Sequence, residues 1–180
     1  VFAKRVGKRC DMQRVYSLLV DNNSGVLSRI SGLFTRRGYN IDSITAGVTA
    51  DPRFTRITIV SSGDEIILSQ IEKQIAKLED VIVVKVLKPE ESVYRELILV
   101  KIRANAQQRS EIVSIADIFR AKIVDAERES LVIELTGTQS KLEAFLQLLD
   151  GYEILELART GIAGLSRGIK DVTNLNLHIY

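Results

Sequence analysis

The 180-residue sequence contains one cysteine, Cys10, and one histidine, His178. A single cysteine excludes an intrachain disulfide and a metal site of the CxxC type. Because the one histidine lies near the end of the chain, Cys–His and Ser–His–Asp catalysis lack the residues that they need. The commonest catalytic toolkits are therefore absent from the sequence.

Long apolar runs are also missing. The longest, LVIEL and VIVVKVL, are interrupted by charged residues. They are far shorter than the roughly 20 residues that a membrane-spanning helix requires. Apolar residues make up 46% of the chain and charges of both signs nearly balance, which is typical of a globular protein with one good core or two small ones. We expect a soluble protein that does not bind membranes.

Basic residues are clustered only at the start of the chain, at Lys4, Arg5, Lys8 and Arg9. Nucleic-acid arms and import signals carry such clusters, but a solvated tail is the simpler interpretation. The tyrosines and phenylalanines are not interleaved with basic residues on strand-like segments, so we expect no nucleic-acid binding. The run from Met12 to Val15 resembles a bacterial start, which favours a cytoplasmic location and leaves an organelle form open.

The first half of the chain predicts the order strand, helix, strand, strand, helix, strand. Apolar residues from Val26 to Phe34 fall on one face of a helix, for which Ser24 is the predicted N-cap and Gly38 the predicted C-terminal stop. The other elements follow from β-branched runs, a second apolar stripe and the Asp51-Pro52 turn signal. They are strands at residues 15–20, 39–48, 54–60 and 81–87 and a helix at residues 64–78.

The same order begins again after the Pro-Glu break at residues 88–91. LFTRRGYNID and IFRAKIVDA occupy equivalent positions about 85 residues apart, which indicates a structural duplication. The predicted elements are strands at residues 96–103, 123–126, 131–136 and 154–158 and helices at residues 109–119 and 142–149.

The predicted fold class is therefore α+β, with two ferredoxin-like βαββαβ domains in tandem. Each domain should place both helices on one face of a four-stranded, mostly antiparallel sheet. We expect an N-terminal extension at 1–13, domains at 14–88 and 95–168, a linker at 89–94 and a tail at 169–180. Because apolar strands leave a sheet face uncovered, either the two units pack together or the chain oligomerises. We expect at least a homodimer that extends the first sheet.

The polar stretch DNNSG, residues 21–25, allows two interpretations. In the first it is only a capped turn, because these residue types are common in strand-to-helix turns. In the second, the backbone amides of Gly25, Val26 and Leu27 bind a carboxylate at the helix start, and Asn22 contacts the ammonium or carboxylate of the same ligand. No phosphate-loop pattern is present, so a small zwitterion suits this loop better than a nucleotide.

Longer motifs add a resemblance to a known family. The run DNNSGVLSRISGLFTRRGYNIDSITAG, followed by FTRITIV and IEKQIAKLEDVIVV, resembles the ACT domain of the regulatory (small) subunit of acetohydroxyacid synthase, also called acetolactate synthase. The patterns N-x-S-G-x-L-x-R and G-L-F-x-x-R-G-Y-N-I are nearly a signature of that family. RELILVKI, IFRAKIVD, LTGTQSKLEAF and ARTGIAGLSRG are similar to its C-terminal domain. The resemblance covers residues 14–168.

This resemblance implies a non-catalytic regulatory subunit in branched-chain amino acid (valine, leucine and isoleucine) biosynthesis. Its partner is a separate catalytic large subunit, which carries thiamine diphosphate, FAD and Mg²⁺ and condenses pyruvate with pyruvate or 2-oxobutyrate. The small subunit raises that activity and confers feedback inhibition, usually by valine, bound where two ACT domains meet. Carried over residue by residue, the valine-binding residues are Asn22, Ser24, Gly25, Val26 and Leu27 of one chain and Asn40 and Ile41 of the other.

The residues themselves do not distinguish valine from leucine or isoleucine, because the side chains differ only by methyl or methylene groups. Two rival functions also remain. The chain could be an ACT-type amino-acid sensor that regulates a different enzyme or a transcription regulator, since a fold does not determine its partner. A free-standing enzyme on a ferredoxin-like scaffold would require a clustered acid–base or metal site, which the sequence does not show.

Overall fold

The computed structural model describes residues 12–168, which form two compact units. One unit comprises residues 12–92 together with 166–168, and the other is Val93–Leu165. The basic cluster, Cys10, His178, the predicted tail 169–180 and residues 1–11 of the predicted extension lie outside the described residues. Within the described part, no helix has the length and apolar character needed to cross a membrane.

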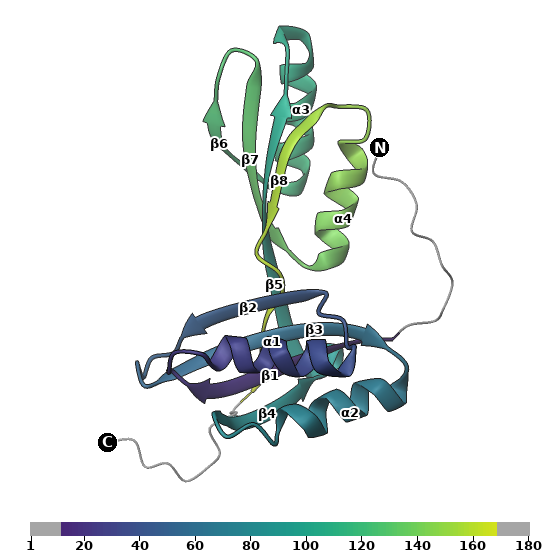
Figure 1. The fold of residues 1–180 in the computed structure, drawn as a ribbon. Coiled ribbons are helices and arrows are strands. Elements are labelled where there is room, and N and C mark those ends of the chain that lie inside the picture. Colours follow the sequence, from purple (N-terminus) through teal and green to yellow (C-terminus); the bar gives the residue numbers. More distant parts are fainter. Residues whose placement is uncertain (1–11, 169–180) are drawn as a thin grey trace. The chain divides into compact units, whose positions relative to one another are not determined.

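The first unit has the order βαββαβ and a sheet with strand order β2-β3-β1-β4 (Figure 1). All three strand pairs are antiparallel, and β2 and β4 form the sheet edges. Both helices lie on one face of the sheet, as predicted. The elements are β1 (Met12–Asp21), α1 (Val26–Arg37), β2 (Ser43–Val48), β3 (Phe54–Gly63), α2 (Glu65–Ile75) and β4 (Val81–Leu87).

The core of the first unit lies between this sheet and its two helices. Ile30 and Phe34 of α1 pack with Leu18 of β1 and Ile57 of β3, and all four side chains are at most 2% exposed. Tyr16 is also fully buried and its hydroxyl donates to the backbone oxygen of Leu68, 2.7 Å away. The apolar stripe of α1 therefore determines which face of the helix packs on the sheet.

The second unit repeats the order on a sheet with strand order β6-β7-β5-β8, to which a short strand β9 adds by pairing with β5. A 3₁₀ turn, Pro89–Glu91, precedes β5. The elements are β5 (Ser92–Arg103), α3 (Ala106–Phe119), β6 (Lys122–Ala126), β7 (Ser130–Gly137), α4 (Gln139–Leu148), β8 (Ile154–Arg159) and β9 (Ala163–Ser166). The two predicted βαββαβ units are thus confirmed.

Three local predictions differ from the structure. Ser24 is not the N-cap of α1, because the helix starts at Val26 after Gly25, whose φ is 85°. Residues 39–42 were predicted to begin a strand, but β2 starts only at Ser43. Tyr39 instead packs its ring edge against Phe34, with ring centroids 6.0 Å apart. Residues 12 and 13, predicted to be part of an extension, belong to β1.

Candidate functional site

The loop between β1 and α1 borders a hollow of about 230 Å³ on the first unit. This volume lies below the roughly 300–1,000 Å³ of sites for drug-sized ligands, so the hollow suits a small ligand. It is lined by Val20, Asp21, Asn22, Asn23, Ser24, Gly25, Val26, Leu27, Thr55 and Ile57. The structure therefore brings five of the seven predicted effector residues together in one place.

The start of α1 has no side-chain cap. Gly25 takes up the left-handed conformation, and the first intrahelical bond is the one that Arg29 N donates to Gly25 O at 2.9 Å. The preceding amides of the helix start have no intrahelical acceptor and carry the positive end of the helix dipole. Val26 and Leu27, which bring two of these amides, line the hollow. This arrangement can bind a carboxylate.

The other helices of the described chain begin differently. Asp64 caps α2 by accepting from Ile67 N, and Thr138 caps α4 by accepting from Lys141 N. At α3 a full capping box is present, in which Asn105 accepts from Gln107 N and Gln108 N while the Gln108 side chain accepts from Asn105 N. Since α3 is the counterpart of α1 in the duplicated fold, the second unit has closed the position that the first unit leaves open.

An ion pair on α1 and one acidic side chain lie near the hollow. Arg29, one turn into α1, makes a bidentate ion pair with Asp80, at 2.5 Å from Nε and 2.7 Å from Nη2. This carboxylate raises the pKa of Arg29 above its ordinary value. Asp21 is the one acidic residue among those that line the hollow. A zwitterionic ligand would therefore find backbone donors and a carboxylate within the same loop.

Asn22 is fixed in the loop by hydrogen bonds to the β2–β3 turn and to β3. Its backbone N donates to Arg53 O at 2.7 Å, and its side-chain Nδ2 donates to Pro52 O at 2.8 Å. Its Oδ1 accepts from the Thr55 hydroxyl at 3.0 Å. An amide group can donate two hydrogen bonds and accept two, so one of each remains for a ligand.

The apolar residues of the predicted site have different surroundings. Leu27 is 49% exposed at the hollow and can cover an aliphatic ligand side chain, whereas Val26 is 4% exposed and belongs to the core. Val26 can therefore offer a ligand its backbone amide more readily than its side chain.

Asn40 and Ile41 do not join this hollow within one chain. They follow the C-terminus of α1, and a helix of twelve residues separates its ends by roughly 18 Å. Asn40 donates to Asp42 Oδ1 at 2.6 Å, and its backbone oxygen accepts from the Ser61 hydroxyl at 2.6 Å. Ile41 packs against the core of its own unit. Their part in a ligand site that two chains share stays a prediction.

Thr55 was missed by sequence reasoning. It lies on β3, 30 residues after Gly25 at the end of the loop, and the register that pairs it with Val20 brings it to the hollow. Without that register, nothing in the sequence near Thr55 relates it to the loop. No group of three His, Cys, Asp or Glu residues that could hold a metal occurs within residues 12–168.

The chain matches two known families in order along its length. Residues 16–83 match the family described as "AHAS small subunit-like ACT domain", and residues 95–168 match the family described as "Small subunit of acetolactate synthase". The chain is thus similar to the same kind of protein in both of its units.

Similar whole proteins are found in archaea and bacteria. The probable acetolactate synthase small subunit of Methanothermobacter thermautotrophicus is 48% identical over 86% of this chain and 92% of its own. The acetolactate synthase isozyme 3 small subunit of Escherichia coli is 48% identical over 88% of this chain and 98% of its own. The crystal structure of the acetolactate synthase small subunit from Thermotoga maritima superposes with a TM-score of 0.81 at 42% identity, covering 87% and 98% of the two chains.

Proposed function

Since the chain belongs to the family of acetolactate synthase small subunits, we propose that it binds a catalytic acetolactate synthase subunit, raises the activity of that subunit and makes it sensitive to valine. The thiamine diphosphate, FAD and Mg²⁺ of the reaction belong to the catalytic subunit in this proposal. A cytoplasmic location is part of the same proposal.

The uncapped start of α1 is the observation that carries the effector site. Valine is a small zwitterion, and its carboxylate can accept hydrogen bonds from the amides at Gly25, Val26 and Leu27. Its ammonium can donate to the free acceptor position of Asn22 Oδ1 and to Asp21, which lines the same hollow. The isopropyl group then lies beside Leu27.

The outer strand of the first unit supports the homodimer. β2 is a sheet edge and carries Ile44 and Val48, which are 39% and 60% exposed. An exposed apolar edge strand is stable when another strand pairs with it. A second copy that joins at this side would bring its own Asn40 and Ile41, which lie shortly before β2, toward the ligand.

A ligand held between two chains also provides a route to regulation. Valine needs only to bind one arrangement of the two chains more tightly than another in order to shift the state that the catalytic subunit meets. A coupling free energy of about 1–3 kcal/mol is typical of allosteric proteins and would be sufficient.

Reconstitution tests the proposal. The purified chain is mixed with the catalytic acetolactate synthase subunit of the same organism, and acetolactate formation is measured with and without valine, leucine or isoleucine. We expect no activity from the chain alone, stimulation of the catalytic subunit, and inhibition that is strongest with valine. Activity of the isolated chain would contradict the proposal. Amino-acid binding without stimulation would instead favour a sensor that serves another enzyme.

Sedimentation tests the dimer. We expect the full chain to sediment at least as a dimer, and valine to strengthen the association, because the ligand contacts two chains in this proposal. A monomer that binds valine with one-to-one stoichiometry would show that Asn40 and Ile41 have no part in the site.

A further inference from the structure

Asn22 forms hydrogen bonds with two residues of the turn between β2 and β3 and with one residue of β3. Arg53 O, Pro52 O and the Thr55 hydroxyl are its partners, at 2.7, 2.8 and 3.0 Å. Two of these bonds involve the side-chain amide. The loop that borders the hollow is therefore attached to the start of β3 through a single asparagine.

The two side-chain bonds determine which way the amide faces. The Pro52 carbonyl can only accept a hydrogen bond, so the amide nitrogen of Asn22 must face it. The amide oxygen then faces Thr55, whose hydroxyl can donate. The remaining N–H and the remaining lone pair of the amide consequently have defined directions before any ligand arrives.

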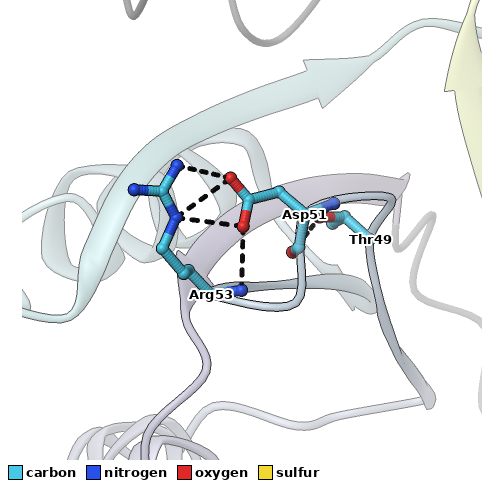
Figure 2. Close-up of polar contacts among 3 residues, drawn as sticks. All are labelled: Thr49, Asp51 and Arg53. Atoms are coloured by element: carbon cyan, nitrogen blue, oxygen red, sulfur yellow. Dashed lines mark hydrogen bonds and ion pairs between the residues drawn. The ribbon is translucent and has the colours of Figure 1, made fainter. Parts of the chain in front are cut away.

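The turn that provides the Pro52 carbonyl is itself braced, as Figure 2 shows. Arg53 donates from Nη2 to Asp51 Oδ2 at 2.6 Å and from its backbone N to Asp51 Oδ1 at 3.0 Å. The Thr49 hydroxyl donates to Asp51 O at 2.8 Å. The Arg53 guanidinium also holds the pKa of Asp51 below its ordinary value. Asn22 is thus bonded to a turn that has hydrogen bonds of its own.

We infer that Thr55 is a positioning residue of the effector site, which acts through Asn22 by fixing the direction of its amide. This inference rests on the proposed function, because it assumes that Asn22 contacts the effector. Thr55 also lines the hollow, so its hydroxyl lies where the loop and the sheet meet. Groups that are fixed before binding lose less conformational entropy when the ligand arrives, and affinity rises accordingly.

The first test compares Thr55→Val, which keeps the shape but removes the hydroxyl, with Thr55→Ser, which keeps the hydroxyl. Thr136→Val makes the same substitution at an exposed strand position of the second unit and is the control. Valine affinity of the full chain is measured by titration calorimetry. Loss of one neutral hydrogen bond should weaken binding about three- to tenfold in Thr55→Val. Thr55→Ser and the control should remain within about twofold of the wild type.

The second test needs no ligand. Hydrogen exchange of the loop at residues 21–25 is measured in the free protein, and we expect faster exchange in Thr55→Val than in Thr55→Ser, since one tether is gone. Equal exchange in both variants would overturn the inference. Faster exchange with unchanged valine affinity would also overturn it, because Thr55 would then act on the loop alone.

The outcomes separate this inference from the proposed function. If the wild-type chain binds none of the three branched-chain amino acids, the proposed function fails and the inference fails with it. If the wild type binds valine and Thr55→Val binds it equally well, only the inference fails.

Discussion

Arg29 donates two hydrogen bonds to the Asp80 carboxylate, and the same guanidinium lies beside Gly25. Nε and Nη2 are used by the Asp80 carboxylate, at 2.5 and 2.7 Å. The third nitrogen, Nη1, lies 3.5 Å from the point where a Cβ of residue 25 would be. The Asp80 backbone oxygen also accepts from Asp21 N at 3.0 Å. The Asp80 carboxylate therefore holds the Arg29 guanidinium next to the uncapped start of α1.

Gly25→Asp should make the chain supply its own anion at this point. The new carboxylate would lie near Arg29 Nη1 and the amides at the start of α1, where the proposed ligand places its own carboxylate. We expect the valine concentration for half-inhibition of the reconstituted enzyme to rise at least about tenfold, while stimulation of the catalytic subunit persists. Acetolactate formation across a valine series measures both quantities.

Gly25→Asn is the matched control for that variant. It has the same shape as Asp and also tolerates the left-handed conformation, which Gly25 adopts with φ of 85°, but it carries no charge. We expect a clearly smaller loss of valine sensitivity from Asn than from Asp. Full valine sensitivity in Gly25→Asp would show that the ligand carboxylate binds elsewhere.

The ends of α1 show what the sequence can and cannot determine. Gly38 was predicted as the C-terminal stop, and it adopts the left-handed conformation with φ of 68°. A glycine that follows an amphipathic stripe and two arginines is a strong signal for the end of a helix. At the other end, Ser24 and Gly25 both suit an N-cap, and local propensity does not choose between them. In the structure Gly25 takes this position, and Asn22, three residues earlier, is bonded to Pro52 O.

Ser24→Ala should consequently have little effect on stability. Ser24 makes no capping bond to α1, so we expect the free energy of unfolding to change by less than about 0.5 kcal/mol. The comparison is Thr138→Ala, which removes the cap of α4 and should reduce the free energy of unfolding by about 1 kcal/mol. Urea denaturation of both variants measures the difference. Equal losses would mean that Ser24 caps α1 in solution.

The lining of the hollow was predictable only in part, because some of its residues are far apart in the sequence. Residues 22–27 form one loop and helix start, so the sequence pattern finds them together. Thr55 reaches the same hollow through the antiparallel register of β1 with β3, which follows from core packing rather than from any local signal. The late start of β2 has a similar cause. Tyr39 and Ile41 have strand-like character, but the core of the first unit takes both side chains.

Tyr16 should make stability depend on alkaline pH. Burial raises the pKa of its phenol from 10.0 to about 12, and the hydroxyl donates to Leu68 O at 2.7 Å. The folded state therefore binds the proton more tightly than the unfolded state. The stabilisation from this group is fully present below pH 10 and is lost as the pH rises from 10 towards 12.

Tyr16→Phe isolates that contribution. At pH 7 the variant should be less stable by about 1 kcal/mol, because the buried Leu68 carbonyl loses a donor. The difference from the wild type should shrink as the pH rises above 10, because only the wild type has the phenol at this position. Urea denaturation at a series of pH values checks this expectation. A difference that stays constant up to pH 11 would mean that the Tyr16 phenol is not responsible.

The second unit contains a charged pair that should prove strongly coupled. Arg159 of β8 donates from Nε and Nη2 to the two carboxylate oxygens of Glu96 on β5, each at 2.8 Å. Glu96 is 6% exposed, while the Arg159 side chain is 36% exposed. The Glu96 carboxylate also raises the pKa of Arg159 above its ordinary value. Removing the arginine would leave a buried carboxylate with neither its partner nor free access to water.

A double-mutant cycle measures this coupling. Arg159→Met should lower the free energy of unfolding by about 1–3 kcal/mol, which is the range for an unsatisfied buried polar group. In Glu96→Gln/Arg159→Met the buried group is neutral and its desolvation penalty is smaller. The double variant should therefore be more stable than the sum of the two single losses predicts. Simple additivity would show that water already solvates Glu96 and that the pair adds little to holding β8 against β5.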